Sequence, residues 1–136
     1  MQVREIMSDA VICCDAQESV TKVAHVMEQH NIGSVPIQQN GELRGIVTDR
    51  DIVLRCVAQG KNADHCQAQE VMSTGITYCT PSSLVRDAVE IMAEHRIRRL
   101  PVIEDNTLKG FVSLCDAARV KADMEIAKAI SEISMD

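Results

Sequence analysis

The residues with the clearest chemical potential form two short pairs, each a hydroxyl residue followed three positions later by an aspartate. These pairs are Thr48 with Asp51 and Ser113 with Asp116. Each follows a Gly-hydrophobic-Val stretch typical of a strand, so each should lie where a helix begins. Backbone N–H groups at a helix start favour phosphate, and one carboxylate can accept hydrogen bonds from two neighbouring hydroxyls. The same spacing also forms a capping box without any ligand, and both roles can hold at once.

The two pairs belong to an internal repeat that covers most of the chain. Glu5-Ile6-Met7-Ser8 returns as Glu70-Val71-Met72-Ser73, a shift of 65 residues that continues without a gap. Two copies are too few for a solenoid, so we expect a pseudo-twofold pair in which each copy covers the apolar face of the other. Further identical pairs at this shift include Cys14 with Cys79, His30 with His95, Pro36 with Pro101, Gly45 with Gly110, and Asp51 with Asp116.

Each copy predicts the element order β-α-β-β-α, which makes the fold class mixed α/β (α+β). In the first copy we expect a strand at 10–13, a helix from a capping-box-like Asp15 and Glu18 to about His30, and hairpin strands at 34–37 and 43–47 around Asn40-Gly41. In the second copy we expect a strand at 75–78, a helix from Thr80-Pro81 to about His95, and strands at 99–103 and 108–112 around Asp105-Asn106. A second helix begins at Thr48 or Ser113.

The length of 136 residues fits a single domain spanning residues 1–136. Within it we expect one motif at 3–59, a polar linker at 60–67, a second motif at 68–120 and a C-terminal helix at 121–136. The apolar positions of this last helix recur at helical spacing, so its stripe could pack back on the domain or against a second chain.

Composition excludes several classes of partner. Apolar residues make up 46% and charged residues 25%, which is typical of a globular protein with an aliphatic core. Tyr78 and Phe111 are the two aromatic residues and the net charge is −6, so the chain lacks the stacking platforms and positive footprint of nucleic-acid binders. No apolar run approaches the roughly 20 residues that span a bilayer, and the first residues do not read as a signal peptide. We expect no nucleic-acid or membrane partner and a cytoplasmic location.

The six cysteines and four histidines do not follow a spacing typical of metal sites or of catalysis. No CxxC, HxxxH or HExxH pattern occurs, and no general base or oxyanion motif accompanies a Cys–His pair. We therefore predict reduced thiols, no catalytic residues, no metal ligands and no enzyme activity. A metal or redox sensor that uses Cys13, Cys14 or Cys66 with a histidine stays open as an alternative. So does a ligand-independent protein-interaction module.

The repeated strand and turn sequences resemble the CBS motif. They are residues 30–37 with 43–51, and residues 95–102 with 108–116. In each copy an I-x-x-hydrophobic-Pro strand precedes a G-hydrophobic-V-[ST]-x-x-D turn. The chain is thus similar to stand-alone bacterial CBS-pair proteins (Bateman modules). The resemblance implies two clefts between the tandem motifs that hold an adenosine ligand such as AMP, ADP, ATP, NAD or S-adenosylmethionine.

The resemblance also implies that each cleft joins one copy's hydroxyl–aspartate pair to segments of the other copy. The carboxylate would accept from the ribose hydroxyls, and aliphatic side chains would sandwich the adenine. One cleft would use Thr48 and Asp51 with Ile76, Thr77, Tyr78, Arg98, Arg99, Leu100 and Pro101. The other would use Ser113 and Asp116 with Val11, Ile12, Cys13, Ser34, Val35 and Pro36.

The two copies differ where a phosphate would bind. Arg98 and Arg99 stand where the first copy has Gly33 and Ser34. Arginine binds phosphate oxygens through two hydrogen bonds at once, although a cation near a helix C-terminus also gains from the helix dipole without a ligand. We expect Arg99 to contact phosphate and the cleft of Thr48 and Asp51 to be the better phosphate site.

The expected function is therefore that of a regulatory sensor. It would bind an adenine nucleotide, with AMP, ADP or ATP foremost, require no cofactor, and signal to a regulated protein that the sequence does not identify. The resemblance implies a homodimer.

Overall fold

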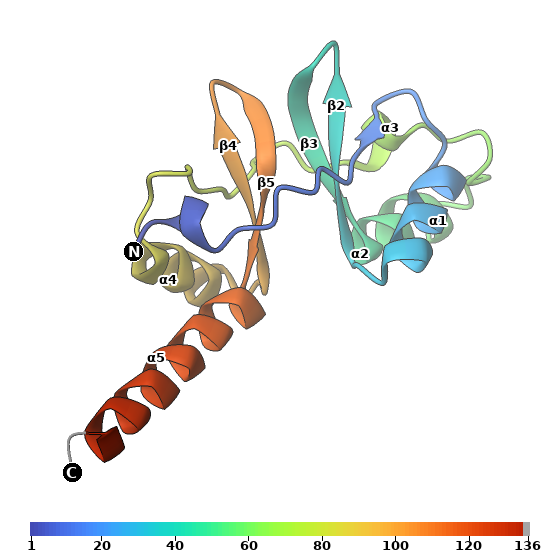
Figure 1. Ribbon diagram of the computed structural model, residues 1–136. Coiled ribbons are helices and arrows are strands. Elements are labelled where there is room, and N and C mark those ends of the chain that lie inside the picture. The colour runs from blue at the N-terminus through green and yellow to red at the C-terminus, as the bar shows by residue number, and fades with distance from the viewer. Residues whose placement is uncertain (135–136) are drawn as a thin grey trace. The chain divides into compact units, whose positions relative to one another are not determined.

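The computed structural model describes residues 1–134 and divides into two compact units (Figure 1). The first unit is Ile12–Ile76. The second unit joins Met1–Val11 to the chain from Thr77 onward. Each unit holds the helix, the hairpin and the second helix of one copy. The helix, the hairpin and the second helix that the repeat predicts are thus each present twice.

The first unit packs helices against a three-stranded sheet. The strand order is β1-β2-β3, with β1 parallel to β2 and β2 antiparallel to β3. At the hairpin turn Asn40 and Gly41 have φ of 54° and 77°, as a type I′ turn requires. The elements are β1 (Cys14–Asp15), α1 (Val20–His30), β2 (Ser34–Gln39), β3 (Glu42–Thr48), α2 (Asp49–Ile52), the π-helical turn η2 (Val53–Val57) and α3 (Ala68–Val71).

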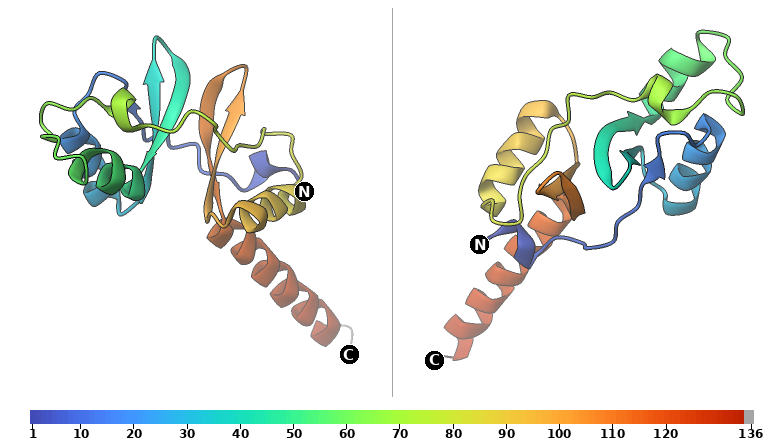
Figure 2. Two further views of the ribbon diagram at one scale, coloured as in Figure 1. Left: turned by 180° about the vertical axis from the view of Figure 1, so that it is seen from behind. Right: turned by 90° about the horizontal axis from the view of Figure 1, so that it is seen from above.

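The second unit repeats this arrangement with a longer final helix. Its hairpin pairs β4 with β5 antiparallel, and Asp105 and Asn106 both have positive φ at the turn. The final helix α5 is continuous over 21 residues and extends beyond the sheet, as the views from behind and above show (Figure 2). No helix of the described residues is long and apolar enough to cross a membrane. The elements are η1 (Val3–Glu5), α4 (Val85–His95), β4 (Arg99–Glu104), β5 (Thr107–Ser113) and α5 (Leu114–Ser134).

The segment that precedes each copy packs on the unit of the other copy. At the start of α4, the Val85 N–H donates to the Met1 carbonyl at 3.0 Å. At the start of α1, the equivalent Val20 N–H donates to the Cys66 carbonyl at 2.8 Å. Residues 3–11, which the sequence assigns to the first motif, therefore lie in the second unit.

The same exchange recurs at the hairpins. Ser8 and Phe111 exchange two backbone hydrogen bonds of 2.8 and 2.9 Å, and Ser73 and Ile46 exchange two of 2.9 Å. These two pairs are related by the repeat shift. Each preceding segment thus adds a short antiparallel bridge to the outer strand of a hairpin, which completes that unit.

Each unit has its own aliphatic core, as the scarcity of aromatic residues predicts. In the first unit the buried face of α1 meets the inner faces of β2 and β3. In the second unit α4 and the exchanged segment cover β4 and β5. Fully buried members include Val20, Val23, Val35, Ile37 and Val47 in the first core, and Val3, Ala88, Leu100, Val102 and Val112 in the second.

Two features of the helices and first strands differ from the prediction. Helix α1 begins after Ser19 and α4 after Leu84, four residues later than the local capping signals indicated. Asp15 instead holds a turn through its Oδ1, which accepts from the Gln17 N–H at 2.9 Å. At both helix starts a carbonyl of the exchanged segment accepts the first N–H of the helix. In α1 the Ser19 side chain adds a local cap, because its Oγ accepts from the Lys22 N–H at 3.1 Å.

The first strand of each copy is shorter than predicted and lies later in the sequence. Strand β1 has two residues, and its counterpart in the second unit is a single bridge between Cys79 and Val102. The predicted linker at 60–67 is also partly structured, because Cys66 is buried and the Ala63 carbonyl accepts from the Thr21 N–H at 3.3 Å.

The close approach of the exchanged segment to β5 generates a stability prediction. A Cβ at Gly110 would lie 2.0 Å from the Ser8 carbonyl oxygen. Because the Ser8 oxygen is a backbone atom that cannot rotate out of the way, Gly110→Ala should force the segment away and lower the free energy of unfolding by about 1–3 kcal/mol, measured by urea denaturation. Gly75→Ala is the matched control, since no atom lies within 4 Å of its Cβ position, and it should change stability by less than about 0.5 kcal/mol. Equal stability of the two variants would contradict a tight fit of the segment.

Candidate functional site

The first candidate site lies where β3 passes into α2. The Thr48 N–H donates to Asp51 Oδ2 at 2.9 Å, and the Asp51 N–H donates to Thr48 Oγ1 at 3.1 Å. This is a complete capping box, so the interpretation as a cap is confirmed. The other carboxylate oxygen, Oδ1, lies 3.4 Å from Ser73 Oγ and 3.9 Å from Arg55 Nε. Both separations exceed the roughly 2.5–2.9 Å of a strong charge-assisted hydrogen bond.

The second candidate site lies at the equivalent junction between β5 and α5. The Ser113 N–H donates to Asp116 Oδ2 at 2.9 Å, and the Asp116 N–H donates to Ser113 Oγ at 3.0 Å. Asp116 Oδ1 is 3.8 Å from Arg119 Nη1. The Asp51 and Asp116 side chains keep 13% and 20% of their surface exposed. Each unit therefore holds one aspartate with one oxygen committed to the cap and the other held more loosely.

The basic neighbours Arg55 and Arg119, and Ser73, were not predicted. Arg55 and Arg119 stand four and three residues after their aspartates, a spacing that brings side chains together on a helix. This spacing is the sequence signal from which the two arginines could have been predicted. Ser73 reaches Asp51 from the segment after α3, so only the long-range pairing of Ser73 with Ile46 positions it.

The hairpins bring some of the predicted residues beside the turns. Ser34 pairs with Thr48 across β2 and β3, and Arg99 pairs with Ser113 across β4 and β5. Within the first unit the structure also holds Ile12, Cys13, Val35, Pro36 and Ile76; within the second it holds Val11, Thr77, Tyr78, Arg98, Leu100 and Pro101. The predicted clefts combine residues of both units, and that combination stays a prediction.

Burial divides the predicted apolar contacts into two groups. Val35 and Leu100 are fully buried, and Pro36 and Pro101 are buried with them. The side chains of Val35 and Leu100 fill the unit cores, and all four residues are buried, so these positions could offer a ligand mainly backbone atoms. Val11 and Tyr78, by contrast, are 47% and 49% exposed, so their side chains, one aliphatic and one aromatic, are accessible to a ligand.

Arg99 is held against an aromatic ring. Its guanidinium carbon lies 3.7 Å from the centroid of Phe111, and burial lowers the pKa of Arg99 from its usual value. The cation–π contact fixes a charged side chain beside the Ser113 turn. Sequence reasoning missed it, although the hairpin register places Arg99 diagonally across from Phe111 on one face. The first copy has Ser34 and Ile46 at these positions and lacks the pair.

The cysteines of the described residues are mostly buried. Burial raises the pKa of Cys14 and of Cys79 to about 11, and it raises the pKa of Cys13. These thiols are therefore protonated at neutral pH, whereas metal ligation and nucleophilic attack need the thiolate. Within residues 1–134, no three His, Cys, Asp or Glu side chains gather as a metal-binding group.

The fold and the repeated turns define a tandem α/β repeat protein, and comparison with known proteins identifies its family. The CBS domain model matches residues 3–57 and 68–132. The chain belongs to the CBS domain family. It is 38% identical over 133 residues to the CBS domain-containing protein YhcV of Bacillus subtilis, covering 97% of this chain and 94% of that protein.

Two solved structures are also similar. The crystal structure of Hypoxic Response Protein I with two coordinated zinc ions is 35% identical, with a TM-score of 0.79, and the match covers 88% of this chain and 98% of that one. The CBS domain pair of protein MJ0100, in complex with 5′-methylthioadenosine and S-adenosyl-L-methionine, is 26% identical with a TM-score of 0.77. That match covers 91% of this chain and 98% of the other.

The buried thiols predict how stability depends on pH. An unfolded thiol ionises near its ordinary pKa of 9.0, whereas Cys14 and Cys79 stay protonated until about 11. The unfolded state therefore releases protons first, so this stability is full below about pH 8.5 and is lost as the pH rises toward 11. Between pH 8 and pH 10, urea denaturation should show a loss of about 1 kcal/mol for each thiol. Cys14→Ala and Cys79→Ala should each flatten this dependence; an unchanged slope in both variants would be the contrary result.

Proposed function

We propose that this protein is a regulatory module that binds an adenosine-containing ligand at its two hydroxyl–aspartate turns. The observation that supports this proposal is that Asp51 and Asp116 have the same hydrogen-bonding arrangement. In both, Oδ2 accepts the capping N–H at 2.9 Å while Oδ1 has contacts of 3.4 Å or more. A ribose hydroxyl could displace those loose contacts without breaking the cap. The adenosine compounds bound by the similar CBS pair of MJ0100 support this choice of ligand.

We propose further that the ligand carries phosphate and that the two sites bind it unequally. Arg99 is already ordered on Phe111, so it would lose little side-chain freedom on meeting a phosphate. Under the proposed exchange between copies, Arg98 and Arg99 would serve the ligand held by Thr48 and Asp51. Ser34 would stand in their place at Ser113 and Asp116. This favours AMP, ADP or ATP at the first turn, with NAD and S-adenosylmethionine as the other members of the tested class.

A ligand panel tests the class of ligand. AMP, ADP, ATP, NAD and S-adenosylmethionine are each added to the full-length protein, and the melting temperature and binding heat are recorded. A ligand at about 100 times its Kd should stabilise the fold by about 2.7 kcal/mol. No change in either signal with any of the five would refute the proposal.

Amide substitutions then assign the sites. Asp51→Asn and Asp116→Asn keep an oxygen for the capping N–H but lose the charge that strengthens hydroxyl binding. Each should weaken binding at its site about tenfold or more, because hydrogen bonds to charged groups contribute about 1.5–3 kcal/mol. Asp105→Asn, at the exposed hairpin turn, changes the same charge away from both turns and should bind normally. Normal binding by both site variants would exclude the ribose assignment.

A metal sensor is the second candidate function, because the similar Hypoxic Response Protein I coordinates two zinc ions. Metal analysis of the purified protein, together with a zinc titration of its melting temperature, separates the two functions. Stoichiometric zinc with no nucleotide response would favour the metal sensor.

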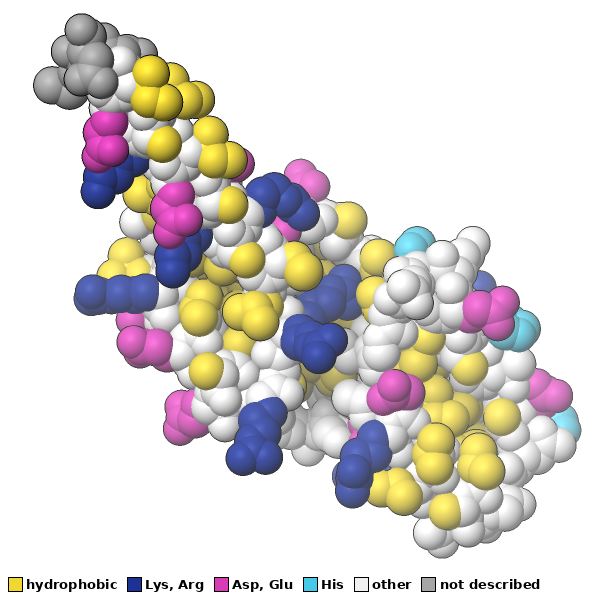
Figure 3. Space-filling view, turned by 90° about the horizontal axis from the view of Figure 1, so that it is seen from below, with side chains coloured by type: hydrophobic (Ala, Val, Ile, Leu, Met, Phe, Trp, Pro, Cys, Tyr) yellow, Lys and Arg dark blue, Asp and Glu magenta, His cyan; other side chains and the backbone are white. Residues whose placement is uncertain are grey.

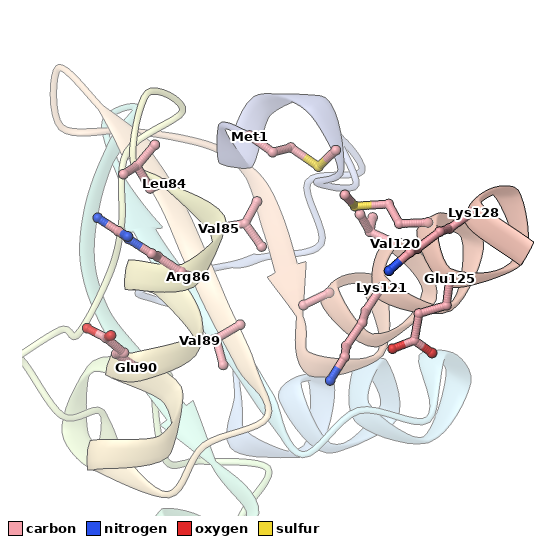
Figure 4. Close-up of a pocket in the computed structure, with 12 residues that line it drawn as sticks. Met1, Leu84, Val85, Arg86, Val89, Glu90, Val120, Lys121, Glu125 and Lys128 are labelled. Carbon is pink, nitrogen blue, oxygen red and sulfur yellow. The ribbon is translucent and has the colours of Figure 1, made fainter. Parts of the chain in front are cut away.

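We also propose that the protein is a homodimer joined through a groove of the second unit. The groove lies between α4 and α5, with Met1 at one end, and apolar side chains from both helices point into it (Figure 4). Its rim carries Arg86 and Glu90 on α4 and Lys121, Glu125 and Lys128 on α5. A rim with both signs of charge can pair with itself across a twofold axis. Figure 3 shows further hydrophobic side chains along the exposed length of α5.

Two lysine substitutions on α5 test which face makes the dimer. Met124 lines the groove and is 63% exposed, whereas Ile126 is 58% exposed and lies about 160° around the helix. Met124→Lys should give monomers in analytical ultracentrifugation, because it would bury a charge in the interface. Ile126→Lys, which adds the same charge outside the groove, should remain dimeric. The opposite pattern would move the interface to the outer face of α5, and a monomeric wild-type protein would refute the dimer.

A further inference from the structure

The side chain of Asp49 lies in the first turn of α2, directly after Thr48 in the sequence. Its Oδ1 accepts from the Arg50 N–H at 2.8 Å, and the Asp49 N–H donates to the Gly33 carbonyl at 3.0 Å. The other carboxylate oxygen, Oδ2, lies against Gly33, because a Cβ added to that glycine would be 3.3 Å from it. These contacts hold the carboxylate beside the residues that lead into β2.

The second copy has a different residue at this position. The Leu114 N–H donates to the Arg98 carbonyl at 2.9 Å, so the backbone contact is the same in both units. Leu114, however, is 44% exposed and uncharged, and Arg98 and Arg99 replace Gly33 and Ser34. The equivalent place therefore holds a carboxylate in the first unit and two arginines in the second.

Among the described residues, no cation neutralises Asp49 by direct contact. The ion pairs of residues 1–134 join four other arginines to other carboxylates. Asp49 and the adjacent Arg50 are both exposed, so water and salt weaken the field of each charge. The charge of Asp49 therefore acts over a short range, on an anion that comes close to Gly33.

We propose that Asp49 determines which adenosine compound the site of Ser113 and Asp116 accepts. This rests on the proposed function, in which residues 34–36 complete that site. A carboxylate beside these residues repels a 5′-phosphate and favours an adenosine compound whose 5′ substituent is uncharged or cationic. 5′-Methylthioadenosine and S-adenosylmethionine are compounds of this kind, whereas AMP, ADP and ATP are not.

The site of Thr48 and Asp51 has the opposite preference. Under the same exchange between copies, Arg98 and Arg99 complete it, and Leu114 adds no negative charge beside them. The two sites would therefore sort adenosine compounds by charge, so one chain could hold a nucleotide and an uncharged nucleoside together. Because Asp49 also follows Thr48 in the sequence, the test must separate the two sites.

The test compares AMP with 5′-methylthioadenosine, which share the adenosine and differ at the 5′ position. Asp51→Asn is the background, because it weakens the site of Thr48 and leaves the other site as the one observed. Adding Asp49→Asn keeps an oxygen for the Arg50 N–H and removes the charge. By titration calorimetry, the Kd for AMP divided by that for 5′-methylthioadenosine should fall about three- to tenfold at low salt, and less at about 1 M salt.

A control and a reciprocal variant accompany this measurement. Glu42→Gln removes the same charge at the far end of β3, about 20 Å along the strand from Thr48, and should change the Kd ratio by less than about twofold. Leu114→Asp adds the carboxylate to the second copy, at a helix start that tolerates an acid. In the Asp116→Asn background it should raise the Kd ratio about three- to tenfold.

The outcomes separate this inference from the proposed function. An unchanged Kd ratio in Asp49→Asn would overturn the inference alone, and so would a fall seen only in the Asp116→Asn background, which would place Asp49 at the other site. Asp51→Asn protein that binds AMP alone, or neither compound, would contradict it too. If the wild-type protein binds no compound of the ligand panel, the proposed function fails and the inference fails with it. If Asp49→Asn folds poorly, a Kd ratio that does not rise in Leu114→Asp overturns the inference.

Discussion

The hydrogen bonds at the starts of α1 and α4 depend on segments that come from elsewhere in the repeat. A helix start leaves N–H groups that need partners, and here the carbonyls of Cys66 and Met1 supply one for each helix. Val3 is buried in the core of the second unit, where it accompanies the Met1 contact. Neither unit is therefore complete from a contiguous copy of the repeat. The packing of each preceding segment on the other copy therefore fixes where the helices start and forms the outer bridge of each hairpin. Through the hairpins it also positions the two hydroxyl–aspartate turns.

The ends of α1 and α4 at His30 and His95, both hairpins, and both capping turns could be predicted, because each depends on neighbours within a few residues. Asn40-Gly41 adopts its turn for local reasons, and Thr48 caps a helix that starts immediately after it. The start of α4 could not be placed, because its partner Met1 lies about 85 residues away in sequence. The start of α1 has a local cap in Ser19, which the prediction missed. The swap of residues 3–11 is likewise absent from local patterns. The Arg99–Phe111 stack was within reach, since the hairpin register alone places both side chains on one face.

The turns show how one motif can serve stability and recognition together. A capping box needs one oxygen of the aspartate, and the second oxygen is a surplus that a cap does not require. Asparagine would cap as well, but it would replace that surplus acceptor with a donor amide. The aspartate at both turns therefore keeps a charged acceptor pointed at the partly exposed surface while the backbone beneath it is already satisfied. Such a site asks little reorganisation of the protein when a hydroxyl arrives.

Helix α5 extends far from the Ser113 turn at which it begins. It starts at Leu114, directly beside Asp116, and continues without a break for 21 residues. At 1.5 Å per residue it is about 30 Å long. A tilt of about 5° at its root would therefore move its far end by roughly 2–3 Å. Because α5 begins at the candidate site, a small change in its direction at the turn would become a much larger displacement at its far end.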